Sequence, residues 1–353
     1  MSQFTHRLPA ILAVFSMGLP TSAMADERGR ALFDFSARSW QAVNDGAMGG
    51  VSSASKINAI GLRLSDRKAG PLALAIASVK VTGESSPASA EPSTRTFTYK
   101  EIPGGKLEMV VHFPPGWKDS DKRPAIVFFF GGGWENGTIQ AFQRQADHLA
   151  RRGMVAARAD YRVKSRQGVN PDKCVEDAKS AVRWLRANAS KLGIDPDRIA
   201  AGGGSAGGHI AACTALTQGL EAKGEDTSIS SRSNALVLFN PVLRFQGIPQ
   251  LMKRLDNDKT LGNALSPTLH VSKDTPPTLL LFGTEDRLLE QGKEYMKLAK
   301  DVGFRAEMFT AEGQGHGFFN RPPWSQRTLA PMDEFLTSLG YLKPESDAIN
   351  ARP

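Results

Sequence analysis

The stretch Arg198-Ile199-Ala200-Ala201-Gly202-Gly203-Gly204-Ser205-Ala206-Gly207-Gly208-His209 decides the fold. Residues 198–201 predict a strand, and a helix is expected to begin near Ser205. A strand that turns directly into a helix forces the central residue into strained dihedral angles, and its neighbours must be small because their backbones nearly collide. Residues 203–207 satisfy the pattern GxSxG, in which a serine hydroxyl is held out at the top of a sheet, at the amino end of the helix. The sequence therefore predicts an activated serine at position 205.

The same stretch fits GxGxxG through Gly202, Gly204 and Gly207, so a dinucleotide-binding loop is the local alternative. That loop requires an acidic residue at the end of the next strand, about 20 residues further on. Glu221 and Glu225 lie at that distance, but in polar loop sequence with no apolar strand before them. The serine pattern is therefore favoured, and no cofactor is predicted.

Strand and helix signals alternate along the rest of the chain. The expected strands are 95–100, 107–113, 125–130, 155–158, 198–201, 235–239, 278–282 and 305–309. The expected helices are 139–152 and 172–188, with others beginning near 205, 288 and 325. Because only the first two strands read as an antiparallel pair, we expect an α/β fold with a mainly parallel central sheet flanked by helices.

Three further strand ends carry residues suited to chemistry, and reactive residues in parallel sheets lie at the carboxyl ends of strands. The strand 125–130 ends in Gly131-Gly132-Gly133-Trp134, whose backbone N–H groups have little side-chain cover. Such N–H groups can bind an oxygen that becomes negative during acyl transfer. The later strands lead to Asp286 and then His316, which gives the chain order serine, acid, histidine. In that arrangement the histidine takes the hydroxyl proton and the carboxylate orients the histidine.

With these motifs in this order, residues 96–344 resemble an α/β-hydrolase of the esterase/lipase group with an HGGGW motif, which includes hormone-sensitive-lipase-type and feruloyl or acetylxylan esterases. The resemblance implies Ser205 as nucleophile, Asp286 as acid and His316 as base. It implies Gly132, Gly133 and Ala206 as the oxyanion donors. One departure is Phe130, which stands where the group usually has a histidine.

Other residues compete for these roles. Glu285 adjoins Asp286, and His209 lies one helical turn after Ser205, although a buried histidine is the favoured interpretation there. His270 is expected to be structural. Five aromatic residues either line an acyl pocket or pack in the core: Trp134, Tyr161, Phe245, Phe318 and Trp324. The polar stretch 240–277 suggests a small lid. No HExxH or clustered Cys/His spacing appears, so no metal is predicted.

The N-terminal residues differ from the rest. Residues 1–25, with an apolar stretch 8–19 and the tripeptide Ala23-Met24-Ala25, predict a secretory signal peptide. Residues 26–82 resemble the opening and closing strands of the complex I intermediate-associated family, a β-sandwich of the galactose-binding type, with the body between them missing. We expect a truncated segment there, a linker at 83–95 and a tail at 345–353.

The composition of the chain narrows the remaining classes of protein to which it could belong. The chain has 353 residues, a formal charge of +8 and 41% hydrophobic residues, which excludes a disordered chain. Because Lys and Arg are scattered, no nucleic-acid partner is predicted, and no later segment suits a membrane span. Cys174 and Cys213 are either one disulfide or two buried thiols. The oligomeric state is left open.

Together these features predict an exported, periplasmic or extracellular serine carboxylesterase acting on short acyl esters, such as acetyl or feruloyl groups on a polysaccharide. One alternative is a peptidase or lactone hydrolase on the same fold. The other is a non-catalytic carbohydrate-binding protein that works through its N-terminal segment.

Overall fold

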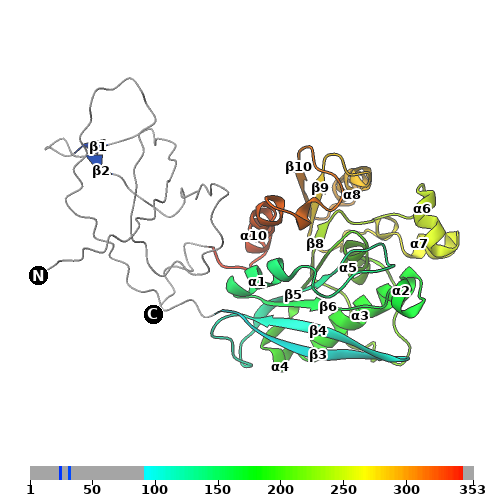
Figure 1. Ribbon diagram of the computed structural model, residues 1–353, viewed down its shortest axis with the longest axis horizontal. Coiled ribbons are helices and arrows are strands. Elements are labelled where there is room, and N and C mark those ends of the chain that lie inside the picture. Colours follow the sequence, from blue (N-terminus) through cyan, green and yellow to red (C-terminus); the bar gives the residue numbers. More distant parts are fainter. Residues whose placement is uncertain (1–23, 26–30, 33–90, 345–353) are drawn as a thin grey trace, which may run out of the picture. The chain divides into compact units, whose positions relative to one another are not determined.

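The computed structural model describes residues 24–25, 31–32 and 91–344 (Figure 1). The chain divides into two compact units, Met1–Thr82 and Gly83–Pro353. In the first unit, β1 (Met24–Ala25) pairs antiparallel with β2 (Ala31–Leu32). The rest of the predicted signal peptide and truncated segment, and the tail 345–353, lie outside the described residues.

The second unit is built on an eight-stranded sheet with the order β10-β9-β8-β7-β5-β6-β4-β3. The pairs β3–β4 and β4–β6 are antiparallel, and every other neighbouring pair is parallel. The predicted α/β fold is therefore confirmed. The strands are β3 (Ser93–Ile102), β4 (Gly105–Phe113), β5 (Arg123–Phe129), β6 (Val155–Ala159), β7 (Ile194–Gly204), β8 (Ala235–Phe239), β9 (Thr278–Gly283) and β10 (Ala306–Ala311).

Helices cover both faces of this sheet. Alternate side chains of β5 enter two separate hydrophobic clusters: Val127 belongs to the cluster that includes residues of α3, α5 and α8, whereas Phe128 belongs to the one that includes residues of α1 and α10. This alternation follows from the two-residue period of a strand buried on both faces. The helices are α1 (Gln143–Arg151), α2 (Lys164–Gln167), α3 (Pro171–Ala187), α4 (Ala189–Leu192), α5 (Ala206–Leu216), α6 (Pro249–Met252), α7 (Lys259–Ala264), α8 (Leu289–Val302), α9 (Trp324–Arg327) and α10 (Leu329–Ser338).

Some element ends differ from the sequence-based expectation. Strand β3 begins at Ser93, so the last three residues of the predicted linker belong to the sheet. The helix expected from Ile139 begins only at Gln143, because Phe142 has a left-handed conformation with φ 64°. Strand β7 continues through the glycines to Gly204, three residues further than predicted, so that Ser205 follows the strand directly.

Both cysteines are free thiols in the core, so the disulfide alternative is wrong. Cys174 lies on α3 and donates to the carbonyl oxygen of Arg162, with a sulfur–oxygen distance of 3.1 Å. Cys213 lies on α5, where burial raises the pKa of its thiol to about 12. Within residues 91–344, none of the helices combines the length and apolar character that a bilayer crossing requires.

Candidate active site

Ser205 is the turn residue between β7 and α5. Its backbone has φ 54° and ψ −118°, a combination that side-chain-bearing residues avoid. The turn is fixed on both sides, because the Ser205 N–H donates to Phe239 O at 2.8 Å and Ser205 O accepts from the His209 N–H at 2.9 Å. Strain of this kind persists only where the surroundings determine the conformation, and it is common at active sites.

The neighbouring glycines are required by close backbone contact. A Cβ atom on Gly207 would lie 2.1 Å from the carbonyl oxygen of Phe129, and one on Gly203 would lie 2.6 Å from Gly207 C. These distances are far below van der Waals contact. Helix α5 therefore starts directly against β5 and β7, which explains the glycines of the GxSxG pattern.

The structure brings Ser205, His316 and Asp286 together at the carboxyl edge of the sheet. His316 Nε2 lies 2.9 Å from Ser205 Oγ, and His316 Nδ1 lies 2.8 Å from Asp286 Oδ2. The three residues follow β7, β10 and β9 respectively. Since a carboxylate accepts, Nδ1 carries the ring proton, and Nε2 is left to accept the serine proton.

Asp286, not Glu285, meets the histidine. The Asp286 side chain is fully buried, whereas Glu285 is exposed. Asp286 also accepts from the Leu288 N–H at 2.9 Å and from Asn240 Nδ2 at 2.7 Å. Three donors therefore converge on this carboxyl group and fix its orientation toward His316.

Asn240 is a site residue that the sequence reading missed. It follows β8 directly, is fully buried and has φ 44°. Its Nδ2 donates to Asp286, and its Oδ1 accepts from the Gly317 N–H at 3.2 Å, next to His316. One amide thus ties the acid to the histidine loop. A polar residue directly after a buried strand was the available signal.

The glycine loop after β5 lies beside the serine. A Cβ atom on Gly131 would be 3.4 Å from Ser205 Cβ. Gly132 and Gly133 have φ 128° and 64°, and the turn is closed by Glu135 and Asn136, whose N–H groups donate to Gly132 O at 3.1 and 3.2 Å.

The three N–H groups predicted as oxyanion donors are free in this arrangement. Among the described residues, no acceptor takes the N–H of Gly132 or Gly133. Ala206 opens α5, so its N–H is one of those that a helix leaves unpaired. All three N–H groups therefore remain available as hydrogen-bond donors.

His209 lies in the core. Its side chain is completely buried, and burial lowers its pKa to about 4. Trp134 Nε1 donates to His209 Nδ1 at 3.2 Å, and His209 Nε2 lies 2.7 Å from Leu265 O. His209 therefore links the glycine loop, α5 and the end of α7 as a neutral ring. The structure bears out the buried-histidine interpretation.

The aromatic candidates mostly pack in the core. Trp134, Tyr161, Phe245 and Phe318 are buried, and Trp324 is half-buried. The stretch 240–277, which was predicted to be a lid, holds the short helices α6 and α7. From it Arg254 forms an ion pair with Glu135 and lies against Gly133, where a Cβ atom would be 3.5 Å from its Nη2.

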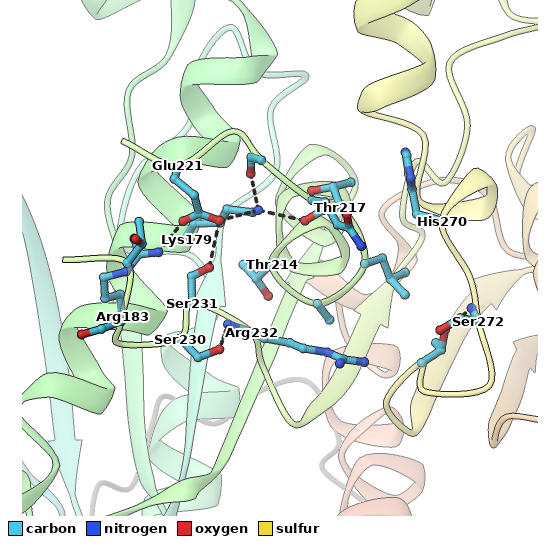
Figure 2. Close-up of a pocket in the computed structure, with 17 residues that line it drawn as sticks. Lys179, Arg183, Thr214, Thr217, Glu221, Ser230, Ser231, Arg232, His270 and Ser272 are labelled. Atoms are coloured by element: carbon cyan, nitrogen blue, oxygen red, sulfur yellow. Dashed lines mark hydrogen bonds and ion pairs between the residues drawn. The ribbon is translucent and has the colours of Figure 1, made fainter. Parts of the chain in front are cut away.

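Two cavities lie away from this site, at the amino ends of β8 and β9. Their volumes are about 510 and 900 Å³, and both are lined by Arg232 and Thr275. Figure 2 shows the smaller one, where the buried Lys179 donates to Thr217 O at 2.8 Å and pairs with Glu221 at 2.9 Å. His270 lines the same cavity, remote from the serine. The buried ammonium group of Lys179 is therefore already paired with groups of the protein itself.

Comparisons with known proteins relate the chain to esterases. Residues 111–297, just over half of the chain, match the family described as BD-FAE. Esterase 2 of Thermogutta terrifontis, solved after phosphonylation by sarin, is 42% identical with a TM-score of 0.68, over 72% of this chain and 98% of its own. The propionate-bound structure of that esterase is 42% identical with a TM-score of 0.67, over 73% of this chain and 98% of its own.

A curated relative, esterase LipC of Mycobacterium tuberculosis, is 30% identical over 225 residues, which is 57% of this chain and 55% of that protein. The chain spans about half the length of the first curated relatives it matches. Because the family match covers more than half of the chain, and the esterase structures nearly three quarters of it, the chain belongs to the BD-FAE family, in the esterase group of the α/β-hydrolases.

Proposed function

We propose that this chain is an exported serine carboxylesterase that hydrolyses short acyl esters through an acyl-enzyme on Ser205. The observation that carries the proposal is the continuous hydrogen-bonded series from Ser205 Oγ through His316 to Asp286, with distances of 2.9 and 2.8 Å. The free N–H groups of the adjacent glycine loop complete the requirements for acyl transfer.

In the first half-reaction, Ser205 Oγ bonds to the acyl carbon as His316 Nε2 takes the hydroxyl proton. The negative carbonyl oxygen then receives hydrogen bonds from Gly132, Gly133 and Ala206. The bond to the alcohol oxygen breaks as His316 returns the proton to that oxygen. Water attacks the acyl-enzyme by the same route, so the acid leaves and the Ser205 hydroxyl is restored.

The proposal of a short acyl group rests on the related esterase, which was solved with propionate and with butyrate bound. The sequence adds the signal-peptide pattern of residues 1–25, which supports export to the periplasm or the medium. The resemblance of the motifs to feruloyl and acetylxylan esterases adds the type of ester, and we therefore propose acetyl or feruloyl esters of polysaccharides as the natural substrate class.

The test is hydrolysis of p-nitrophenyl acetate by the wild type and Ser205→Ala. We expect the variant to keep its fold and to lose about 10⁴-fold or more in kcat, because no nucleophile remains. Ser325→Ala is a matched control, because the Ser325 hydroxyl is buried and has no hydrogen-bond partner among the described residues.

A fluorophosphonate probe with peptide mapping should label Ser205 in the wild type and in Ser325→Ala. Hydrolysis that persists in Ser205→Ala, or labelling at another residue, would refute the proposal.

A further inference from the structure

The glycine loop requires an anchor at its start, because its N–H groups can stabilise an oxyanion only if they are aimed in advance. The loop begins at Phe130, directly after β5. An imidazole at this position could brace the loop through a polar atom, but the phenyl ring of Phe130 has none. A group outside the loop must therefore hold it.

Tyr161 provides that contact. Its side chain is completely buried, and its hydroxyl donates to Phe130 O at 2.7 Å. The two rings are stacked, with centroids 4.1 Å apart and an angle of 17° between the planes. The backbone of Gly137 also packs against Phe130, where a Cβ atom would lie 2.3 Å from the phenyl ring. Phe130 is thus fixed by a hydrogen bond and by packing.

The sheet register places Tyr161 there. Strands β5 and β6 are parallel with Phe129 opposite Ala159, so the residues after both strands emerge side by side. The segment after β6 also holds the far end of the loop, because the Lys164 N–H donates to Trp134 O and the Ser165 N–H donates to Glu135 O, both at 2.9 Å. Gly132 and Gly133 lie between these two anchors.

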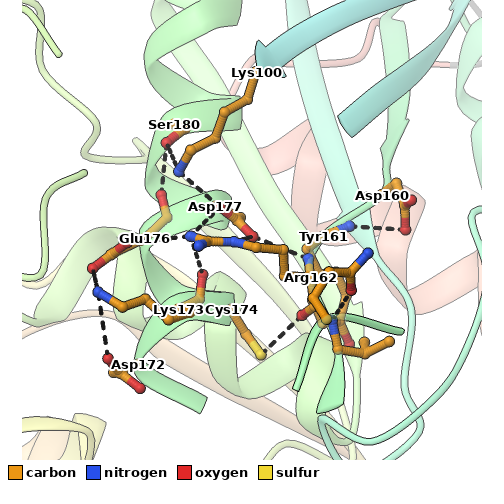
Figure 3. Close-up of polar contacts among 12 residues, drawn as sticks. Lys100, Asp160, Tyr161, Arg162, Asp172, Lys173, Cys174, Glu176, Asp177 and Ser180 are labelled. Carbon is orange, nitrogen blue, oxygen red and sulfur yellow. Dashed lines mark hydrogen bonds and ion pairs between the residues drawn. The ribbon is translucent and has the colours of Figure 1, made fainter. Parts of the chain in front are cut away.

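The Tyr161 backbone is itself held by charged groups (Figure 3). Its N–H donates to Asp160 Oδ1 at 2.9 Å, and its carbonyl oxygen accepts from Arg166 at 2.9 Å. The next residue, Arg162, makes two hydrogen bonds of 2.8 Å to the buried Asp177. Burial raises the pKa of Tyr161 well above its usual value, so the hydroxyl stays a donor across the working pH range.

We propose that Tyr161 is a positioning residue for ester hydrolysis, whose hydroxyl fixes Phe130 O and thereby aims the N–H groups of Gly132 and Gly133. This inference rests on the proposed function for its kinetic consequence. It makes a separate claim about the order of the loop, which is measurable without turnover.

The kinetic test compares Tyr161→Phe with Tyr295→Phe. Tyr295 is the matched control, because it is also completely buried and its hydroxyl makes a hydrogen bond with Thr278 Oγ1 at 3.1 Å, at the start of β9 and away from the glycine loop. Both variants keep the ring and lose one hydrogen bond. Tyr161→Phe should lower kcat about tenfold with KM nearly unchanged, because the misaligned donors act in the transition state. Tyr295→Phe should retain kcat.

Amide hydrogen exchange of residues 130–137 is the second measurement. Exchange in this segment should accelerate about tenfold in Tyr161→Phe and stay unchanged in Tyr295→Phe. Equal kcat in the two variants, a change confined to KM, or unchanged exchange in Tyr161→Phe would overturn the inference. If the wild type neither hydrolyses esters nor reacts with a fluorophosphonate, the proposed function fails, and the exchange comparison still decides whether Tyr161 holds the loop.

Discussion

Asn240 shows how a single side chain can serve two reactive groups. Its amide donates to the carboxyl oxygen that also meets His316, and its carbonyl oxygen accepts from the residue after His316. The left-handed backbone conformation of Asn240 suits asparagine better than most residues, because a short polar side chain tolerates φ above zero. The side-chain hydrogen bonds and the backbone conformation at position 240 therefore both favour asparagine.

Asn240→Asp should lower kcat about 10- to 100-fold, because it replaces a donor with a like charge beside Asp286 and loosens the histidine loop. Aspartate also tolerates the left-handed conformation, so the backbone is preserved. Asn234→Asp is the control: it lies just before the same strand, and its Oδ1 accepts from the Ile199 N–H and from Arg186, which a carboxylate can also do. Steady-state kinetics on p-nitrophenyl acetate compare the two. If the kcat of Asn240→Asp were within about twofold of wild type, this role for Asn240 would be contradicted.

The sequence located Ser205, Asp286 and His316 as candidates because a GxSxG pattern marks the serine and an acid and a histidine follow later strands in the matching chain order. Asn240 and Tyr161 could not be assigned in the same way. The function of each depends on which strands are neighbours: β8 lies next to β9, and β5 lies next to β6. Both pairs of strands are consecutive along the chain, but the sequence does not show that they pair or in which register, so residues with such indirect roles become visible only with the topology.

At the scale of elements, the predicted strands and long helices were found, and the differences were at their ends. The hydrophobic periodicity indicates which residues face the core, but the residue at which a helix or strand ends depends on the local backbone conformation. Phe142 is apolar and fits the helical pattern, yet its left-handed conformation delays α1. Conversely, glycines disfavour strands in general, yet β7 runs through three of them because α5 and β5 press against it.

This close packing predicts the effect of Gly207→Ala. The added methyl group would meet the carbonyl oxygen of Phe129 at 2.1 Å, so α5 must move away from β5. We expect the free energy of unfolding to fall by about 3 kcal/mol, because an overpacked core cannot relax around backbone atoms. Gly105→Ala in β4 adds the same methyl group with no atom within 4 Å. Urea unfolding measures both, and similar stabilities would show that the tight start of α5 is not required.

At the scale of the whole molecule, the described hydrolase elements all belong to the second unit, Gly83–Pro353. The match with the Thermogutta terrifontis esterase covers 98% of that chain but only 72% of this one. A complete esterase fold therefore needs little beyond the elements of the second unit. The sequence alone raised the opposite possibility, in which the N-terminal segment binds carbohydrate and the hydrolase unit is inert. The two hypotheses differ in whether the first unit, Met1–Thr82, is needed for the protein's function.

A chain that starts at Gly83 should therefore fold and hydrolyse p-nitrophenyl acetate with kcat/KM within about twofold of the full chain, because no residue of the proposed site is removed. Circular dichroism checks the fold, and Ser205→Ala in the shortened chain serves as the inactive reference. Polysaccharide binding is measured in parallel on both lengths. If the shortened chain is folded but inactive, the first unit takes part in the reaction. If neither length is active and only the longer one binds polysaccharide, the non-catalytic alternative is correct.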